Sequence, residues 1–189
     1  MYSHKDGVVL RKLEYNDCNT LLELKKESWW GTHATKVFNE YDQQEWFKNL
    51  NEKTLVMVGL LNEELIGFVI YSNIDWINRK LNVSGSILKN FRKMEITYPA
   101  FCAGLDFAFE MLNMHRIEGE VLDCNLGAKY LEINKIGMII EGKRKEAIYK
   151  CGQYYDSILI RMLRREWLEL PRVKSYNGVC NLNFGGPRC

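Results

Sequence analysis

Runs of apolar and β-branched residues, separated by short polar segments, predict a protein built around a β-sheet. Seven strands are expected, over residues 8–13, 54–61, 65–71, 81–88, 115–122, 145–150 and 157–163. Residues 62–64 join the second strand to the third, and residues 151–156 join the sixth to the seventh. Two hairpins are therefore predicted.

Apolar positions at helical spacing predict four helices among these strands. They are expected over residues 17–26, 43–50, 98–112 and 125–135. Asn16 and Asp17 are suitable N-caps for the first helix, and Asn125 opens the fourth. The order β-α-α-β-β-β-α-β-α-β-β predicts a mixed α/β sheet flanked by helices.

One domain is expected over residues 1–170, because a chain of 189 residues without repeats or linkers fits a single core. A hydrophobic content of 47% and a charged content of 26% exclude wholesale disorder. From Pro171 onward the apolar periodicity is lost and turn residues such as Asn177 and Gly178 appear. Residues 171–189 are therefore expected to form an irregular tail.

The net charge of +2 gives no electrostatic argument for binding nucleic acid. No run approaches the roughly 20 apolar residues that cross a bilayer, and no apolar stretch follows the first residues. The six cysteines form no CxxC pair, which argues against a disulfide framework and against a metal site. We expect a cytoplasmic protein without a membrane partner.

A specific combination of residues lies in the second half of the chain. It consists of residues 105–109, Asn125, residues 135–138, Glu141-Gly142 and residues 152–156. Together with the element order, this combination resembles the GCN5-related N-acetyltransferases over residues 8–167. The resemblance implies a GNAT fold, with a mostly antiparallel sheet splayed at the cofactor site. It also implies direct transfer of an acetyl group from acetyl-CoA to a primary amine, without a metal.

The resemblance is to the branch that holds ribosomal-protein, spermidine and aminosugar acetyltransferases. Residues 73–79, 152–156 and 164–167 look like those of pseudaminic-acid pathway enzymes, which acetylate the 4-amino group of a nucleotide-linked sugar. A nucleotide-linked 4-aminosugar is therefore the first acceptor hypothesis. The alternatives are a protein N-terminal or polyamine acetyltransferase, and a non-catalytic acyl-CoA-binding module. Edge strands near the carboxyl end are compatible with a homodimer.

In that family a glycine-rich loop opens the long helix, and its backbone N–H groups bind the pyrophosphate of coenzyme A. The matching positions here are Arg92, Lys93, Met94, Glu95, Ile96 and Thr97. Glu95 and Thr97 replace the two glycines, and Arg92 and Lys93 can offset the charge of Glu95. Either the loop keeps its course with modified contacts, or the site has lost the cofactor.

The resemblance also implies contacts with the pantetheine arm of coenzyme A. It assigns backbone contacts to Ser86, Ile87 and Leu88, a side-chain contact to Asn125, and a place on the cofactor side to Lys135. For Asn125 a helix N-cap is the alternative interpretation, and both roles can coexist.

The proton donor that many relatives use is a tyrosine near the end of the fourth helix. Counting back from Gly137, that position is Ile133, so the usual acid is absent. Tyr130, one turn earlier, is a candidate substitute, and partly buried packing is its alternative.

For the general base, Glu118 and Glu120 lie on the same face of their strand. Ser84 on the preceding strand is a further polar candidate. The alternative for the glutamates is a solvated strand face.

Aromatic residues beside polar groups suggest where the acceptor binds. Two such groups are candidates: Trp29, Trp30 and His33, and Asp75, Trp76 and Asn78. Stacking on a sugar or base, with a few hydrogen bonds, suits such residues. At least one of the tryptophans is expected only to anchor the first helices.

Overall fold

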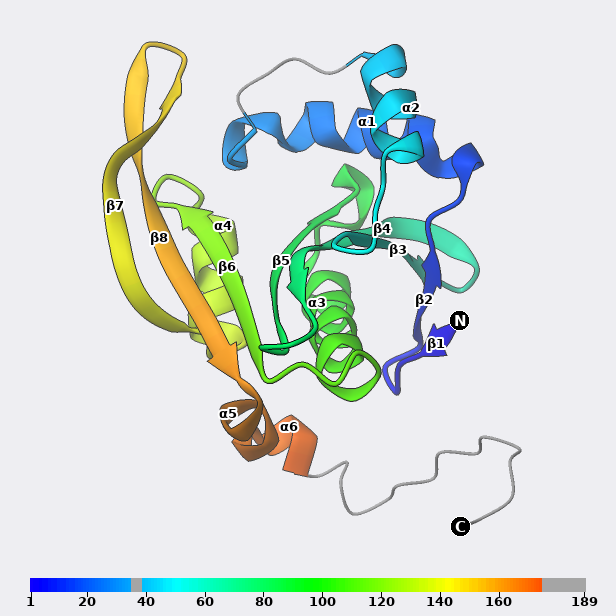
Figure 1. Ribbon diagram of the computed structural model, residues 1–189, viewed down its shortest axis with the longest axis vertical. Coiled ribbons are helices and arrows are strands. Elements are labelled where there is room, and N and C mark those ends of the chain that lie inside the picture. The colour runs from blue at the N-terminus through cyan, green and yellow to red at the C-terminus, as the bar shows by residue number, and fades with distance from the viewer. Residues whose placement is uncertain (35–38, 175–189) are drawn as a thin grey trace.

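One eight-stranded sheet organises the computed structural model, which describes residues 1–34 and 39–174 (Figure 1). The strands lie in the order β1-β2-β3-β4-β5-β6-β8-β7, and all neighbours are antiparallel except β5 and β6. The strands are β1 (Tyr2–Ser3), β2 (Val8–Lys12), β3 (Leu55–Leu61), β4 (Glu64–Asp75), β5 (Lys80–Ile87), β6 (Arg116–Leu122), β7 (Ile139–Lys150) and β8 (Gln153–Leu163).

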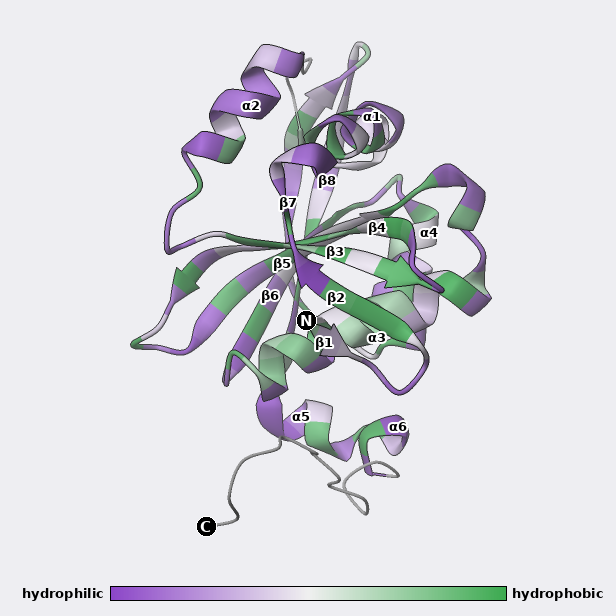
Figure 2. Ribbon diagram, turned by 90° about the vertical axis from the view of Figure 1, so that its right-hand side faces the viewer, coloured by the Kyte–Doolittle hydropathy of each residue, from purple (hydrophilic) through white to green (hydrophobic). Residues whose placement is uncertain are grey.

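Helices cover both faces of this sheet. The helices are α1 (Cys18–Ser28), α2 (Glu40–Lys48), α3 (Met94–Glu110), α4 (Leu126–Lys129), α5 (Arg164–Glu169) and α6 (Pro171–Lys174). Short 3₁₀ turns are η1 (Tyr15–Asp17), η2 (Trp29–Gly31) and η3 (Lys89–Phe91), and a π-helical segment, η4 (Tyr130–Lys135), continues α4. Helices α3 and α4 pack on one face, and α1 and α2 pack on the other. In Figure 2 most of α2 is hydrophilic, as expected for a helix that covers the outside.

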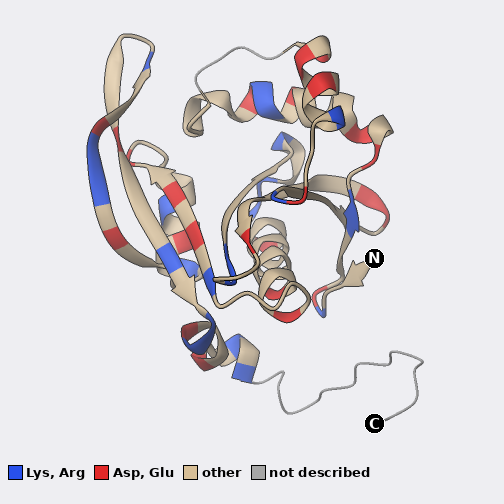
Figure 3. Ribbon diagram, in the orientation of Figure 1, with Lys and Arg blue, Asp and Glu red and all other residues tan. Residues whose placement is uncertain are grey.

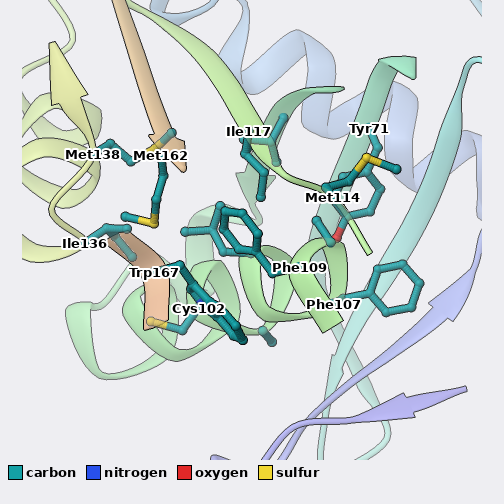
Figure 4. Close-up of a cluster of buried hydrophobic side chains, with 14 of the residues drawn as sticks. Tyr71, Cys102, Phe107, Phe109, Met114, Ile117, Ile136, Met138, Met162 and Trp167 are labelled. Carbon is teal, nitrogen blue, oxygen red and sulfur yellow. The ribbon is translucent and has the colours of Figure 1, made fainter. Parts of the chain in front are cut away.

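The larger core lies between α3 and the sheet and extends under the C-terminal helices (Figure 4). Phe109 of α3 stacks on Trp167 of α5, with ring centroids 5.1 Å apart. Asp106, also on α3, accepts hydrogen bonds from His4, Trp167 and Arg172. The side chain of Asp106 thus fastens both ends of the domain to α3.

The predicted element order is confirmed, and its boundaries differ in places. Helix α3 begins at Met94 and not at residue 98, because Lys93 is extended and its carbonyl already accepts from the N–H groups of Ile96 and Thr97. Strand β4 continues to Asp75, and β7 begins at Ile139. The two-residue strand β1 was not predicted.

The domain also continues past residue 170. Helix α6 covers the first four residues of the expected tail, and its Val173 is buried in the core. Residues 175–189, the rest of that predicted tail, lie outside the described residues. In the part of the chain that the structure describes, no helix is long and apolar enough to cross a membrane.

Candidate active site

The sheet opens between its two parallel strands. Strands β5 and β6 pair over three residues only, Lys80–Asn82 with Arg116–Glu118. Beyond this junction β5 stays paired with β4, and β6 stays paired with β8. The two strands diverge, as Figure 1 shows, and leave a gap whose facing backbone groups need other partners. The predicted splay of the sheet is thereby located at residues 83–87 and 119–122.

The direction of the backbone groups shows which of them face this gap. The N–H of Leu88 donates to the carbonyl of Ile66 at 2.9 Å. In an antiparallel pair the bonding direction alternates, so Leu88 and Ser86 turn their backbone groups toward β4. Ile87 and Gly85 turn theirs toward the gap. Of the three positions assigned to pantetheine, only Ile87 therefore offers main-chain groups there.

Arg92 already occupies one of the backbone groups that face the gap. Its Nε donates to the carbonyl of Ile87 at 2.8 Å, and its guanidinium lies 3.5 Å from Glu27. Arg92 thus spans from the end of β5 to α1, which holds its charge beside the gap.

The N-terminus of α3 borders a shallow hollow lined by Met94, Glu95, Tyr98, Pro99 and Lys135. The first N–H groups of a helix lack intrahelical partners and carry partial positive charge, which favours phosphate. Lys135 adds a cation from η4, whereas Glu95 adds an exposed carboxylate. The donor set of this hollow and the open edge at Ile87 together fit coenzyme A. The hollow is open although Glu95 and Thr97 replace the two glycines.

Asn125 serves as an N-cap and also holds a loop. Its Oδ1 accepts from the N–H of Ala128 at 3.1 Å, and its Nδ2 donates to the carbonyl of Gly31 at 2.9 Å. A Cβ at Gly31 would lie 2.9 Å from Asn125 Nδ2, so glycine permits this approach. Asn125 therefore joins the start of α4 to the loop that follows α1.

A hydrogen-bonded cluster forms on the α1 side of the gap. Ser157 of β8 donates to Glu120 Oε2 at 2.9 Å, and Nε2 of His33 lies 2.8 Å from Ser157 Oγ. Glu120 Oε1 accepts from Arg144 of β7 at 2.6 Å. Thus His33 and Glu120, which the sequence placed in separate candidate groups, lie together around Ser157.

The hydrogen bonds assign the tautomer of His33. The single hydroxyl proton of Ser157 goes to Glu120, so the contact with His33 is an Nε2–H donating to Ser157 Oγ. In the neutral ring this leaves Nδ1 with a lone pair that can accept a proton. Burial lowers the pKa of His33, and Lys150 and Arg144 lower it further against the opposing carboxylate of Glu120. The imidazole is therefore neutral at pH 7.

The same cluster keeps Glu120 ionised. Burial by itself would raise the pKa of Glu120, but the hydrogen bonds from Ser157 and Arg144 outweigh it and hold the pKa below its ordinary value. The cluster therefore places the neutral imidazole of His33 beside the ionised carboxylate of Glu120.

Lys150 fixes the aromatic loop that carries His33. Its ammonium donates to the carbonyls of Trp29 and Thr32 and lies 4.6 Å from the centre of the Trp29 ring. Only 4% of Lys150 is exposed. Trp29 thus anchors the loop, while Trp30 is 61% exposed and free to contact an acceptor.

The second predicted acceptor group lies elsewhere. Asp75 caps its own turn by accepting from the N–H groups of Ile77 and Asn78 and from the side chain of Asn78. Trp76 is exposed in the same turn. Because Asp75 pairs with Lys80, which in turn pairs with Arg116, this turn is roughly four strand residues, or ~13 Å, from Glu120.

The other catalytic candidates do not join the cluster either. Glu118 receives a 2.6 Å hydrogen bond from Arg116, and Ser84 is exposed on β5. Tyr130 is 48% exposed, with the ammonium of Lys135 5.4 Å from its ring centre. Ile133 packs against the core.

Sequence reasoning missed Ser157, Arg144 and Lys150. They lie on β7 and β8, and only the register of these strands brings them to Glu120 and the aromatic loop. A lone serine or lysine in a strand gives no local signal. Within residues 1–34 and 39–174 no group of three or more His, Cys, Asp or Glu is arranged to hold a metal ion.

Comparison with known families agrees with this geometry. Residues 8–138, more than half of the chain, match the model of the acetyltransferase (GNAT) domain. The chain belongs to the GNAT family. The predicted GNAT fold is thereby confirmed, and so is the prediction of an acetyltransferase.

Individual relatives lie within the predicted branch of GNAT enzymes. The Bacillus subtilis protein named "Putative ribosomal N-acetyltransferase YdaF" is 25% identical over 173 residues, which cover 86% of this chain and 94% of that protein. Spermidine N-acetyltransferase from Vibrio cholerae, solved in complex with CoA and spermine, has a TM-score of 0.81 at 21% identity. The match covers 87% of this chain and 100% of that chain. A dodecameric structure of the Vibrio cholerae enzyme matches with a TM-score of 0.76 at 21% identity, over 87% of this chain and 98% of that chain.

Proposed function

We propose that this GNAT enzyme acetylates a primary amine that docks beside His33, with acetyl-CoA bound between the gap and the N-terminus of α3. The observation that carries the proposal is the His33–Ser157–Glu120 cluster at the diverging edge of β6. Acetyl-CoA supplies the acetyl group, and coenzyme A leaves as the free thiol. The protein's task is to orient the amine and to remove its proton.

His33 is the proposed proton acceptor. Among the described residues Nδ1 has no hydrogen-bond partner, and a neutral imidazole at pH 7 can take a proton from the attacking amine. When Nδ1 is protonated, the ring becomes a cation, and Glu120 Oε2 lies 3.5 Å from Nε2 to stabilise it. Ser157 forms hydrogen bonds with both His33 and Glu120 and so keeps the two side chains together. Glu120 is therefore a positioning residue, and the sequence-based choice of Glu120 as the base itself is replaced.

The charges around the gap favour an acceptor with one amine over a polyamine. Three of the four carboxylates on β6 and β7 are paired with arginines: Glu118 with Arg116, Glu120 with Arg144, and Glu141 with both Arg116 and Arg161. Blue and red segments accordingly lie side by side across these strands in Figure 3. A polyamine needs carboxylates without internal partners. The similarity to spermidine acetyltransferases, at 21% identity, is a similarity of fold. It supports the polyamine alternative only to that extent.

Two acceptor classes carry one amine: a protein N-terminus and the nucleotide-linked 4-aminosugar. The name of YdaF, a putative ribosomal N-acetyltransferase, is compatible with a protein acceptor. The second rests on the sequence resemblance and on the exposed Trp30, which can stack on a ring. The aminosugar, a homodimer and a cytoplasmic location stay predictions.

The first test is thiol release from acetyl-CoA with three acceptors: spermidine, a peptide with a free N-terminus and a UDP-linked 4-aminosugar. We expect one of the two monoamines to exceed spermidine at least tenfold in kcat/KM. Preference for spermidine would overturn the acceptor class. Transfer to none of them, with no acetyl-CoA binding by calorimetry, would overturn the enzyme proposal.

The second test addresses the base. His33→Gln retains a polar side chain and removes the proton acceptor, so kcat is expected to fall about 100-fold or more. Binding of acetyl-CoA should be unchanged. The exposed Glu23→Gln, on the outer face of α1, is the control that should match the wild type. A His33→Gln variant with wild-type kcat would remove His33 from the mechanism.

A further inference from the structure

Lys150 brings a positive charge to the aromatic loop after α1 that the protein does not neutralise. Its buried ammonium donates to the carbonyls of Trp29 and Thr32. Among the residues that the structure describes, no carboxylate pairs with it. Burial lowers the pKa of Lys150, and the other groups that act on it are the thiols of Cys124 and Cys151. Because buried charges in proteins are normally paired, this one can attract a negative group from outside the protein.

Arg144 brings a second positive charge to the same place, and it is open to solvent. Its Nη1 donates to Glu120 Oε1 at 2.6 Å, while Glu120 Oε2 lies 3.5 Å from Nε2 of His33. Arg144 and His33 are therefore held at the two oxygens of one carboxylate. The side chain of Arg144 is 58% exposed, and that of His33 is 31% exposed. A molecule whose amine reaches His33 can thus also reach the guanidinium.

Most of the hydrogen-bond donors of Arg144 are unused. Among the described residues, only its Nη1 has a partner. On β8, Asp156 pairs with Lys143 and Lys145 and not with Arg144. Glu146 on β7 forms no ion pair with Arg144 either. Nε and Nη2 are therefore available for the bidentate contact with a carboxylate or phosphate to which a guanidinium is suited.

The charges that act on His33 show that this positive excess reaches the place where the amine docks. Burial lowers the pKa of His33 most, and the charges of Lys150 and Arg144 lower it further, against the opposing charge of Glu120. Two cations and one carboxylate therefore act on the imidazole from β6 and β7. Such a site favours an acceptor with a negative group near its amine and disfavours one with several amines.

We propose that Arg144 binds a negatively charged group of the acceptor, a phosphate or a carboxylate, while the acceptor's amine docks beside His33. This inference rests on the proposed function and narrows its substrate class to a primary amine that also carries an anion. Lys150, buried against the loop carbonyls, adds attraction without contacting the acceptor. The diphosphate of a nucleotide-linked aminosugar would supply a phosphate. In a peptide, an acidic side chain next to the N-terminal residue would supply a carboxylate.

The first experiment compares acceptors that differ in negative charge. Two peptides with a free N-terminus, which differ only in Asp or Asn as the second residue, test the carboxylate. A UDP-linked 4-aminosugar and the methyl glycoside of the same sugar test the phosphate. With the wild type, kcat/KM is expected to be at least tenfold higher for the charged member of one pair. The pair that shows the difference identifies the source of the anion.

The second experiment removes the guanidinium. Arg144→Gln should raise KM at least tenfold for the charged acceptor and leave KM for its neutral counterpart unchanged. Because Arg144 also acts on Glu120 and His33, kcat is expected to fall by the same factor for both acceptors. Arg144→Lys keeps the charge but loses the planar fork, so it should recover part of the preference.

Lys145→Gln is the matched control. It removes one positive charge from the next residue of β7, but Lys145 pairs with Asp156, 3.1 Å away. Asp156 and Ser157 are successive residues of β8, so their side chains lie on opposite faces of the sheet. Lys145→Gln should therefore keep the wild-type preference for the charged acceptor.

Binding without turnover gives an independent readout. Calorimetry with the charged acceptor, and with CoA in place of acetyl-CoA, measures the Kd of the acceptor. Arg144→Gln should weaken this binding at least tenfold, and added salt should weaken wild-type binding by screening the charges.

Several results would overturn the inference. They are equal kcat/KM for both members of each pair, a preference that Arg144→Gln retains, or a preference that Lys145→Gln loses to the same extent. If the wild type transfers to no amine, charged or neutral, the proposed function fails. Transfer to charged and neutral amines at the same rate defeats this inference alone.

Discussion

The Asp106 cluster offers a quantitative test of what fastens the ends of the domain. Asp106 has a side chain only 7% exposed, and it accepts from Trp167 Nε1 at 2.6 Å, Arg172 Nη1 at 2.7 Å and His4 Nε2 at 3.0 Å. Asp106→Asn keeps the shape of the side chain. It removes the negative charge and turns one acceptor into a donor that faces donors.

The expected loss follows from burial. Breaking a buried ion pair by removing one partner costs about 3–5 kcal/mol, because the other charge is left in a poorly solvated place. At a urea slope of about 2 kcal/mol/M, the unfolding midpoint should fall by roughly 2 M. Burial alone would raise the pKa of Asp106, yet its hydrogen-bond and charge partners hold it below the ordinary value. Its stabilising effect is therefore complete above about pH 4 and shrinks as pH falls below that.

The assay is urea unfolding at pH 7 with a matched control. Glu169→Gln breaks an ion pair with Lys174 in the same C-terminal region, but both side chains are more than half exposed. That pair should be worth less than about 1 kcal/mol. If Asp106→Asn costs no more than Glu169→Gln, the cluster contributes no net stability and the argument from burial is refuted.

Three further changes test the loop and the cluster around His33. Lys150→Met keeps the aliphatic stem but loses hydrogen bonds to two carbonyls, so urea unfolding should show about 2–4 kcal/mol of destabilisation. Gly31→Ala forces a Cβ to within 2.9 Å of Asn125 Nδ2, so the acceptor KM should rise severalfold while acetyl-CoA affinity, measured by calorimetry, stays constant. Glu120→Gln removes a charge that raises the pKa of His33, so the acid limb of kcat/KM should move to lower pH as kcat falls. An unmoved acid limb would separate Glu120 from His33.

The fold was predictable because its signals are local. Alternation and helical periodicity within short segments were sufficient to order seven strands and four helices. The boundaries that failed depend on contacts made at a distance. Helix α6 is ordered through Arg172 and Val173, whose partners lie on α3 and in the core, and nothing in the composition of residues 171–174 indicates this.

The site was predictable only in part, and for the same reason. Motif positions indicated Asn125 and the start of α3 as cofactor contacts, which stay predictions, whereas Ser157 and Lys150 come to the cluster around His33 through strand register alone. Asp75 lies apart from the cluster around His33, and its carboxylate accepts hydrogen bonds within its own turn.

The three-residue junction between β5 and β6 divides the sheet into two plates, β1–β5 and β6–β8, that meet along a narrow seam. Beyond this seam the facing backbone groups of β5 and β6 have no partner strand, and acetyl-CoA bound between them would take the place of that strand. The amide protons of Gly85 and Ile87 should therefore exchange with deuterium quickly in the free enzyme and slowly once acetyl-CoA is bound. Cosubstrate binding would then be, in mechanical terms, the step that completes the sheet.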